Sequence, residues 1–240
     1  VTQTVTSLLV NLLVEHGCWF AVSTNVQKNA ENTYLCPGKP PFHRTRMTST
    51  LFATAYFGPV SWYWHFHRSP QPTLEACEHY VKQSWRNRCV IATANGPMTL
   101  SLPVEHDKSG HTGIKDIKLS DHGNWQHLHW NALVSAYNST PFFEYYRDDF
   151  QPFYEKKYTY LFDFNEALRA LICRLLDIHP LVKYTDHFVE TLPDGMMDFR
   201  ETIHPKPSRQ KPDPDFKVVP YYQVFRDKYG FLENLSIIDL

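Results

Sequence analysis

The stretch RCVIATANGPMTLSLPV, from Arg88 to Val104, decides the fold. Its first part, Arg88 to Ala94, is rich in residues that favour β-strands, and Met98 to Val104 has the composition of a partner strand. Asn95-Gly96 lies between them, and both residues tolerate the positive φ angles of a tight hairpin turn. The stretch therefore predicts an antiparallel β-hairpin.

More strands are predicted around this hairpin. Leu51 to Tyr56 has the pattern of a buried strand that Gly58-Pro59 ends, and Leu74 to Tyr80 is a second strand. Between them VSWYWHFHR, at 60–68, predicts a short aromatic helix. Ile114 to Leu119 alternates apolar and charged residues, as a half-exposed strand does. Shorter strands are expected at Leu181 to Tyr184 and at Tyr221 to Phe225.

Three helices are expected after the hairpin. A cap at Asp121 or Asn124 starts the first, which runs to about residue 137, and Pro141 starts the second. The third, Tyr158 to Asp177, has the clearest apolar stripe. The stripe residues are Trp125, Leu128, Ala132, Leu133 and Ala136 in the first helix, and Leu161, Phe164, Leu168, Leu171, Ile172 and Leu175 in the third.

Together these patterns predict a mixed α/β (α+β) fold. Its central β-sheet, with the hairpin at Asn95-Gly96, is packed by three helices in 124–177. Six of the 17 prolines fall between Pro193 and Pro220, which predicts an extended surface loop.

The two ends of the chain differ from this core. Residues 1–46 end in the breaker-rich CPGKPPFHRTR, and we expect them to lie upstream of the natural start or to form a poorly ordered extension. The alternative is a helical arm over 5–22. The domain itself is expected at 47–240. SIIDL, at 236–240, has the composition of a helix that begins there, so the natural chain is expected to continue.

Composition excludes several classes of protein. A net charge of -1 gives no field that would attract nucleic acid or an acidic membrane, so neither is an expected partner. No stretch reaches the roughly 18–20 apolar residues of a membrane span. The five cysteines form no CxxC pair, which favours reduced thiols in the cytoplasm over disulfides or zinc. P-loop, nucleophile-elbow and HExxH motifs are absent, and no cofactor is predicted.

EHYVKQSWRNR, residues 78–88, is the strongest candidate for ligand contact. It interleaves the basic Lys82, Arg86 and Arg88 with the aromatic Tyr80 and Trp85. Guanidinium groups bind carboxylate or phosphate through a planar fork. In an extended chain alternate side chains share a face, which here would hold Tyr80, Lys82, Ser84, Arg86 and Arg88. The alternative is an ordinary solvated strand edge that basic residues protect.

DHGNWQHLHW, residues 121–130, holds a second candidate. His127 and His129 are two residues apart, so on a helix they face apart, and we predict no metal site. His129 lies four residues after Trp125, at the edge of the apolar stripe. It is either a hydrogen-bonded, half-buried histidine or a general acid or base that faces a cleft, since histidine titrates near neutral pH.

With these segments identified, the chain resembles the WbqC-like protein family over about residues 51–240. Family members begin near Leu51 and run beyond Asp239, which agrees with both expectations about the ends. The chain departs from the family at Glu233, where proline is usual, and at its opening, which lacks the Gln-Pro-x-Tyr-x-Pro pattern. The four stretches that carry the likeness are ATAYFGPVSWYWHF (53–66), EHYVKQSWRNRCVIATANGPMTLSLPV (78–104), NWQHLHWNALVSAYNSTPFFEYY (124–146) and YYQVFRDKYGFLENLSIIDL (221–240).

The resemblance implies a bacterial protein of surface polysaccharide biosynthesis, of the O-antigen and lipopolysaccharide type. We therefore expect a transferase that acts on a nucleotide- or lipid-linked sugar, with His129 transferring a proton. The alternatives are a non-catalytic accessory protein that binds the same sugar and, more weakly, an interaction scaffold built on the loop 204–214. The residues expected to bind the ligand are Tyr80, Lys82, Trp85, Arg86, Asn87 and Arg88.

Overall fold

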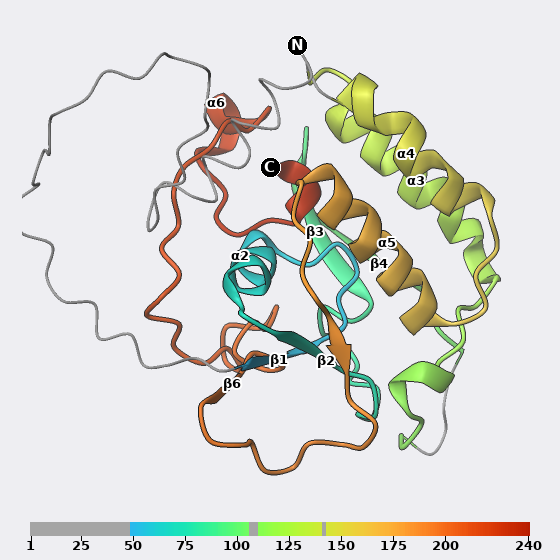
Figure 1. Cartoon of the computed structure of the whole chain (residues 1–240). Coiled ribbons are helices and arrows are strands. Elements are labelled where there is room, and N and C mark those ends of the chain that lie inside the picture. The colour runs from blue at the N-terminus through green and yellow to red at the C-terminus, as the bar shows by residue number, and fades with distance from the viewer. Residues whose placement is uncertain (1–48, 106–109, 141–142) are drawn as a thin grey trace, which may run out of the picture.

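A four-stranded parallel sheet is the first of two sheets in the structure, a computed structural model that describes residues 49–105, 110–140 and 143–240 (Figure 1). The expectations for residues 1–46 and for a helix start at Pro141 lie outside the described residues. The sheet has the spatial order β5-β2-β1-β6, and every neighbouring pair is parallel. Its strands are β1 (Ser49–Ala53), β2 (Pro72–Glu75), β5 (Lys183–Tyr184) and β6 (Met196–Asp198).

The predicted aromatic helix is confirmed as α2 (Val60–Arg68), which connects β1 to β2. Parallel neighbours need such a crossover, because the chain must return to the starting edge of the sheet. α2 packs on β1 through aromatic rings: the centroid of Phe52 lies 5.2 Å from that of Trp62 and 5.3 Å from that of Phe66. Full burial of such a side chain stabilises the fold by roughly 1.5–3 kcal/mol, so these rings anchor the sheet.

The predicted strands are present but shorter than expected. β1 ends at Ala53 and β2 ends at Glu75, because the chain turns out of the sheet after each of them. Phe57, with a φ of 42°, lies in the first of these turns. The strand expected at Leu181 to Tyr184 is confirmed as β5, whereas the one at Tyr221 to Phe225 is wrong. That segment is irregular chain before the short helix α6 (Arg226–Tyr229).

The predicted hairpin is confirmed as β3 (Arg88–Thr93) and β4 (Gly96–Ser101). Thr93 pairs with Gly96, so the two turn residues are 94 and 95, one position earlier than expected. Gly96 has a φ of 100°, a conformation that residues with a side chain rarely adopt. The mixed α/β class is confirmed, but the hairpin forms a second sheet that is separate from the parallel one and not part of a single central sheet as expected.

The strand predicted at Ile114 to Leu119 is wrong. Ile114–Asp116 forms a turn of 3₁₀-helix, and only isolated bridges connect the following residues to their neighbours. Ile114 and Ile117 are both buried. Their spacing of three residues places both side chains on one side of a 3₁₀ turn, which explains the burial without a strand.

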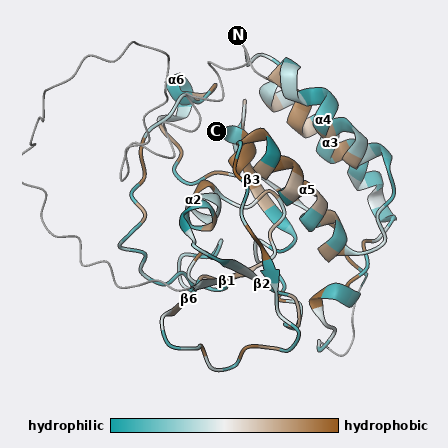
Figure 2. Ribbon diagram, in the orientation of Figure 1, coloured by the Kyte–Doolittle hydropathy of each residue, from teal (hydrophilic) through white to brown (hydrophobic). Residues whose placement is uncertain are grey.

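The three helices expected in 124–177 are confirmed as α3 (Trp125–Tyr137), α4 (Phe143–Glu155) and α5 (Leu161–Leu175). Figure 1 shows them on one side of the molecule, and α3 contacts β3 of the hairpin. Figure 2 shows long apolar segments along α5, and its predicted stripe is buried except for Leu175, which is partly exposed.

The apolar stripe of α3 differs from the predicted one at a single turn. Leu128 is 60% exposed, and the buried position belongs to His129 instead. His129 lies four residues after Trp125 and four before Leu133, so these three side chains share one face of the helix. Leu128 also has helical spacing, three residues after Trp125, but it lies to one side of the buried face that runs through Trp125, His129 and Leu133.

Asp239 ties the last described residues to the rest of the fold. Its carboxylate accepts hydrogen bonds from the hydroxyls of Tyr137 and Tyr221 and from the side-chain amide of Gln223. Ile237–Asp239 forms one turn of 3₁₀-helix, which matches the helical start predicted for SIIDL. The Pro-rich loop 204–214 contains no helix or strand, as expected.

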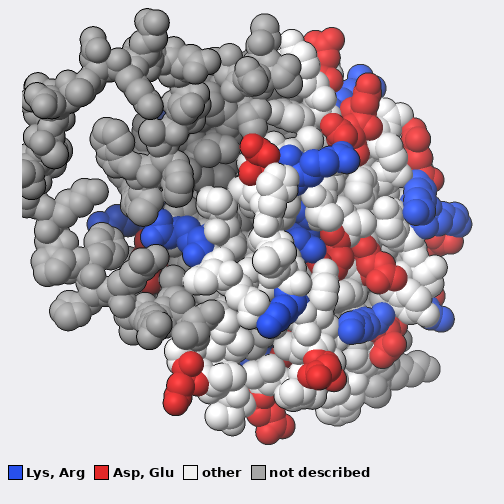
Figure 3. Space-filling view, viewed as in Figure 1, with Lys and Arg blue, Asp and Glu red and all other residues white. Residues whose placement is uncertain are grey.

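Charged side chains of both signs are interspersed on the face shown in Figure 3. Because the net charge is only -1, a site that attracts an anion must be built by local pairing and burial. In the described part of the chain, no helix has both the length and the apolar content needed to cross a membrane.

Candidate functional site

The segment 78–88 is a series of turns and bends rather than an extended strand edge. Gln83 has a φ of 59°, and the Ser84 hydroxyl donates to the carbonyl of Val81 at 2.6 Å. Such turns change the direction of successive side chains, so alternate residues do not line up as they do on a strand. The common face predicted for Tyr80, Lys82, Ser84, Arg86 and Arg88 is therefore wrong, and the segment lines two cavities instead.

The first cavity, here called the outer pocket, has a volume of about 310 Å³. That volume lies at the lower end of the range found for small-molecule sites. Four of the predicted ligand-binding residues line it together, and the rest of the lining comes from the loops around the hairpin. The lining residues are Tyr80, Lys82, Gln83, Asn87, Arg88, Val104, Glu105, Gly110, Thr112 and Ile117.

The cations of the outer pocket form no ion pair with the acidic side chains that the structure describes. Among the described residues, neither Lys82 nor Arg88 forms an ion pair, although the exposed Glu105 also lines the cavity. The Nε of Arg88 and the Oδ1 of Asn87 are buried and have no hydrogen-bond partner within the described part of the chain. Burial raises the pKa of the Tyr80 hydroxyl, against the opposing effect of Arg88 and Arg86. This local excess of positive charge suits an anionic ligand.

Arg86 differs from Arg88, because its guanidinium group is already paired with a buried carboxylate. Its Nε donates to Glu78 Oε1 at 2.7 Å, its Nη2 donates to Glu78 Oε2, and Glu201 lies 3.4 Å away. Burial lowers the pKa of Arg86, but the bonds and charge of Glu78 outweigh it, so the pKa is raised. For the Glu78 carboxyl group burial has the opposite effect and raises the pKa, and the hydrogen bonds and charge of Arg86 only partly offset this rise. The pair is a structural unit that fixes the turn.

His129 lines neither cavity. Its Nδ1 lies 2.9 Å from the hydroxyl of Tyr56, which in turn lies 2.9 Å from the hydroxyl of Tyr154. Burial lowers the pKa of His129 to about 4, although a hydrogen bond with the Ser101 backbone opposes the shift. The residue therefore has the environment of a hydrogen-bonded core histidine, and it shares neither of these two cavities with Arg86 or Arg88.

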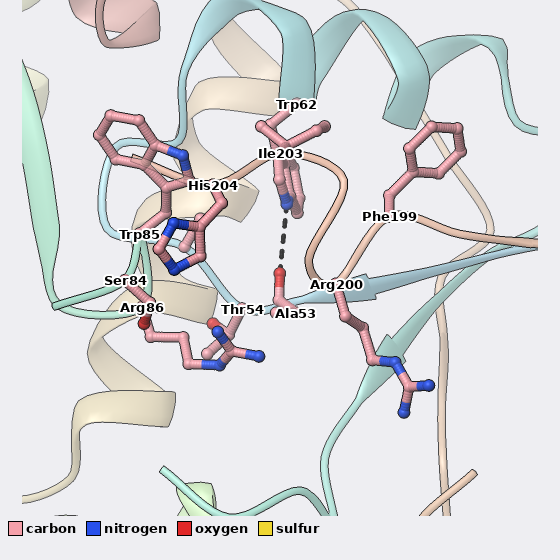
Figure 4. Close-up of a pocket in the computed structure, with 11 residues that line it drawn as sticks. Ala53, Thr54, Trp62, Ser84, Trp85, Arg86, Phe199, Arg200, Ile203 and His204 are labelled. Carbon is pink, nitrogen blue, oxygen red and sulfur yellow. Dashed lines mark hydrogen bonds between the residues drawn. The ribbon is translucent and has the colours of Figure 1, made fainter. Parts of the chain in front are cut away.

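The second cavity, here called the switch-point crevice, lies at the carboxyl end of the parallel sheet (Figure 4). The chain runs from β1 outward to β2 and β5, then returns to the opposite side of β1 for β6. Open α/β sheets bind ligands beside such a reversal, outside the carboxyl ends of the strands. The crevice is lined by Ala53, Thr54, Ala55, Trp62, Ser84, Trp85, Arg86, Phe199, Arg200, Ile203 and His204.

Ion pairs hold the strand ends around this crevice. Glu75, the last residue of β2, is fully buried and accepts a hydrogen bond from Arg200 Nη1 at 3.2 Å and another from the Thr185 hydroxyl. Asp198, the last residue of β6, pairs with Arg200 at 2.8 Å. Burial acts to raise the pKa of Asp198, but the bonds from Arg200 prevail and lower it. Each guanidinium at this edge therefore has a carboxylate partner.

Several of these residues were missed by the sequence analysis. Glu75 and Asp198 directly end short apolar strands, and that position would have flagged them if the parallel topology had been recognised. Arg200, Glu201 and His204 follow β6 in an irregular segment, where no local pattern marks them. In the described part of the chain, no group of three or more His, Cys, Asp or Glu side chains is arranged to hold a metal ion.

Comparison with known proteins identifies relatives but no solved fold. The model of the WbqC-like protein family matches residues 55–197. An uncharacterized protein of Mycobacterium tuberculosis is 34% identical over 100 residues, which are 41% of this chain and 43% of that protein. The match thus spans less than half the length of this relative. No solved structure matches the chain significantly.

Proposed function

The chain belongs to the WbqC-like protein family, and we propose that it acts in bacterial surface polysaccharide biosynthesis by binding a nucleotide- or lipid-linked sugar in the outer pocket. The family's association with O-antigen and other surface polysaccharides supports the pathway. A transferase acting on this sugar is the first form of the proposal. The free thiols of Cys77, Cys89 and Cys173 support a location in the cytoplasm, where thiols stay reduced.

The observation that carries the ligand class is the positive charge of Arg88 and Lys82, which form no ion pair among the described residues, together with unpartnered buried polar atoms of the lining residues Arg88 and Asn87. A phosphate of the linked sugar would take the guanidinium fork of Arg88, with Lys82 at the more exposed side. Asn87 Oδ1, to which no described residue donates, would accept a hydrogen bond from a sugar hydroxyl. The ring of Tyr80 would flank the sugar.

Arg86 has a positioning role in this proposal rather than a ligand contact. Its pair with Glu78 fixes the turn, and its backbone carbonyl accepts a hydrogen bond from Asn165 Nδ2 at 2.7 Å. The backbone carbonyl of Asn87 accepts one from the Leu102 amide at 2.8 Å. These bonds hold the segment that presents Asn87 and Arg88 to the outer pocket.

Isothermal titration of the full chain with a panel of nucleotide sugars tests the ligand assignment. Arg88→Ala should weaken the affinity by about 10- to 100-fold, because a hydrogen bond to a charged group contributes about 1.5–3 kcal/mol. Arg88→Lys should fall between this variant and the wild type, since it keeps the charge but loses the fork. Arg147→Ala is the matched control, an exposed arginine of α4 outside both cavities. Equal affinity in Arg88→Ala and the control would remove the outer pocket as the site.

A non-catalytic accessory protein is the second form of the proposal. The position of His129 favours it, because the one residue expected to transfer a proton lines neither cavity and is held by Tyr56. Mass spectrometry of reactions that contain a bound nucleotide sugar and candidate acceptors separates the two forms. Transfer that survives in His129→Gln keeps the transferase and discards the role of His129, whereas binding without transfer supports the accessory protein.

A further inference from the structure

Two residues that line the switch-point crevice, Trp85 and His204, carry buried ring nitrogens. Within the described part of the chain, neither the indole Nε1 of Trp85 nor the Nε2 of His204 has a hydrogen-bond partner. The His204 residue is only 4% exposed. A buried donor without an acceptor costs about 1–3 kcal/mol, so two in one small cavity call for an explanation.

The hydrogen bonds of His204 fix which of its nitrogens is the donor. The backbone amide of Lys206 donates to Nδ1 at 2.9 Å, so Nδ1 carries a lone pair and Nε2 carries the proton of the neutral ring. Nε2 lies 3.9 Å from the nearest Glu201 oxygen, which is too far for a hydrogen bond. Burial lowers the pKa of His204, so the neutral ring prevails at neutral pH. The indole N–H of Trp85 is a donor in any state.

The charges around the crevice argue against an anion. Its two guanidinium groups, those of Arg86 and Arg200, are each paired with a buried carboxylate, from Glu78 and Glu75 respectively. Asp198 pairs with Arg200, and Glu201 lies beside Arg86, so acids outnumber bases here. A further negative charge would meet net repulsion. An uncharged acceptor with two lone pairs matches two N–H donors without adding charge.

We infer that the switch-point crevice is a second binding subsite, in which the N–H groups of Trp85 and His204 hold the carbonyl oxygen of an uncharged amide. The free space is about 10 Å³, which admits an oxygen atom but not a whole ligand. Trp85 and Arg200 are half-buried residues of the lining and lie on opposite sides of the crevice in Figure 4, so the remainder of the ligand would lie outside, between them. The apolar Ala53, Trp62 and Phe199 complete the wall and suit the carbon side of an acyl group.

This subsite is distinct from the proposed anion site, since Lys82 and Arg88 do not line it. An N-acylated sugar is one ligand class that carries such a carbonyl, but the inference does not depend on the outer pocket. If titration shows no role for Arg88, the crevice can still bind an amide, and the reverse also holds.

Nuclear magnetic resonance of the full chain tests the inference, because each of the six tryptophans contributes one indole N–H signal. The indole N–H signal of Trp85 is assigned by its correlation with the backbone signals of the same residue and by its loss in Trp85→Phe. N-methylacetamide and N-acetylglucosamine should shift it in a saturable manner, whereas acetate and glucose at equal concentration should not. In His204→Phe the same additions should shift it at least several-fold less, while Trp130→Phe, outside the crevice, should behave as the wild type.

Each alternative occupant gives a different result. A shift with acetate equal to that with the amides would identify an anion site and overturn the inference. A shift with glucose equal to that with the amides would identify a hydroxyl site, with the same consequence. Absence of a saturable shift with every probe would leave a bound water as the acceptor and would also overturn it. Because the wild-type protein supplies the main result, the test stands even where a variant fails to fold.

Discussion

The outer pocket and the switch-point crevice draw on the same turn, yet they differ in how their charges are matched. Lys82 and Arg88 in the outer pocket have no acidic partner among the described residues, whereas Arg86 and Arg200 in the crevice are each tied to a buried carboxylate. A cation paired inside the fold stabilises the fold, and an unpaired one is available to a ligand. Arginines two positions apart in one motif can therefore have different purposes.

Removal of Arg86 is expected to have the largest effect. Arg86→Ala would leave Glu78, which is 5% exposed, without its bidentate partner, and an uncompensated buried charge costs roughly 3–5 kcal/mol. Arg88→Ala breaks no ion pair and should change the free energy of unfolding by at most about 1 kcal/mol. Urea denaturation of both variants at neutral pH measures the difference.

A double variant separates lost charge pairing from lost packing at this position. In Arg86→Met with Glu78→Leu neither charge of this pair remains, so much of the stability lost in Arg86→Ala should return. Equal losses in Arg86→Ala and Arg88→Ala would show that the two arginines do not differ in the way described.

The motif at 78–88 shows how much of the candidate site can be predicted from the sequence. It identified residues that line the two cavities, although a solvated strand edge was an equally open interpretation of the same pattern. It could not distinguish Arg86 from Arg88, since the partner of Arg86 depends on a turn that only the folded chain defines. The extended-strand assumption failed here because β-propensity is weak in a segment without apolar alternation. Long apolar periodicities, such as that of α5, were read correctly because burial follows them directly.

His129 and the residues of the crevice illustrate a second limit of prediction from a single sequence. Spacing placed His129 at the edge of a helical stripe, whereas it lies within the buried face, and its partner Tyr56 lies 73 residues away in the chain. Glu75, Asp198 and Arg200 meet only because β2 and β6 flank β1 in the sheet. Residues brought together by strand order leave no signal in a single sequence.

The pH dependence of stability tests whether His129 belongs to the core rather than to a site. Its pKa is about 4 in the folded protein against an ordinary value of 6.5, so the unfolded chain takes up the proton first as the pH falls. Its contribution should be constant above about pH 6.5, and stability should be lost between pH 6.5 and 4, by about 3 kcal/mol at most.

The matched comparison is between two histidines of α3. His129→Gln should flatten the pH dependence across that window, whereas His127→Gln, at an exposed position, should leave it as in the wild type. Chemical denaturation across the window gives both curves. A wild-type profile in His129→Gln would mean that the histidine titrates normally, as a residue open to a ligand would.

The smallest expected effect is that of Lys82→Ala, which compares the two cations of the outer pocket with each other. Lys82 is exposed, whereas Arg88 is partly buried, so a phosphate bound there is screened from Lys82 by solvent. Lys82→Ala should weaken binding of a nucleotide sugar by less than about fivefold, because exposed charge pairs contribute at most about 1 kcal/mol. Raising the salt concentration should remove most of this difference but little of that caused by Arg88→Ala. If Lys82→Ala costs more affinity than Arg88→Ala, the phosphate lies nearer the mouth of the pocket than the buried guanidinium, and the ranking of the two cations is reversed.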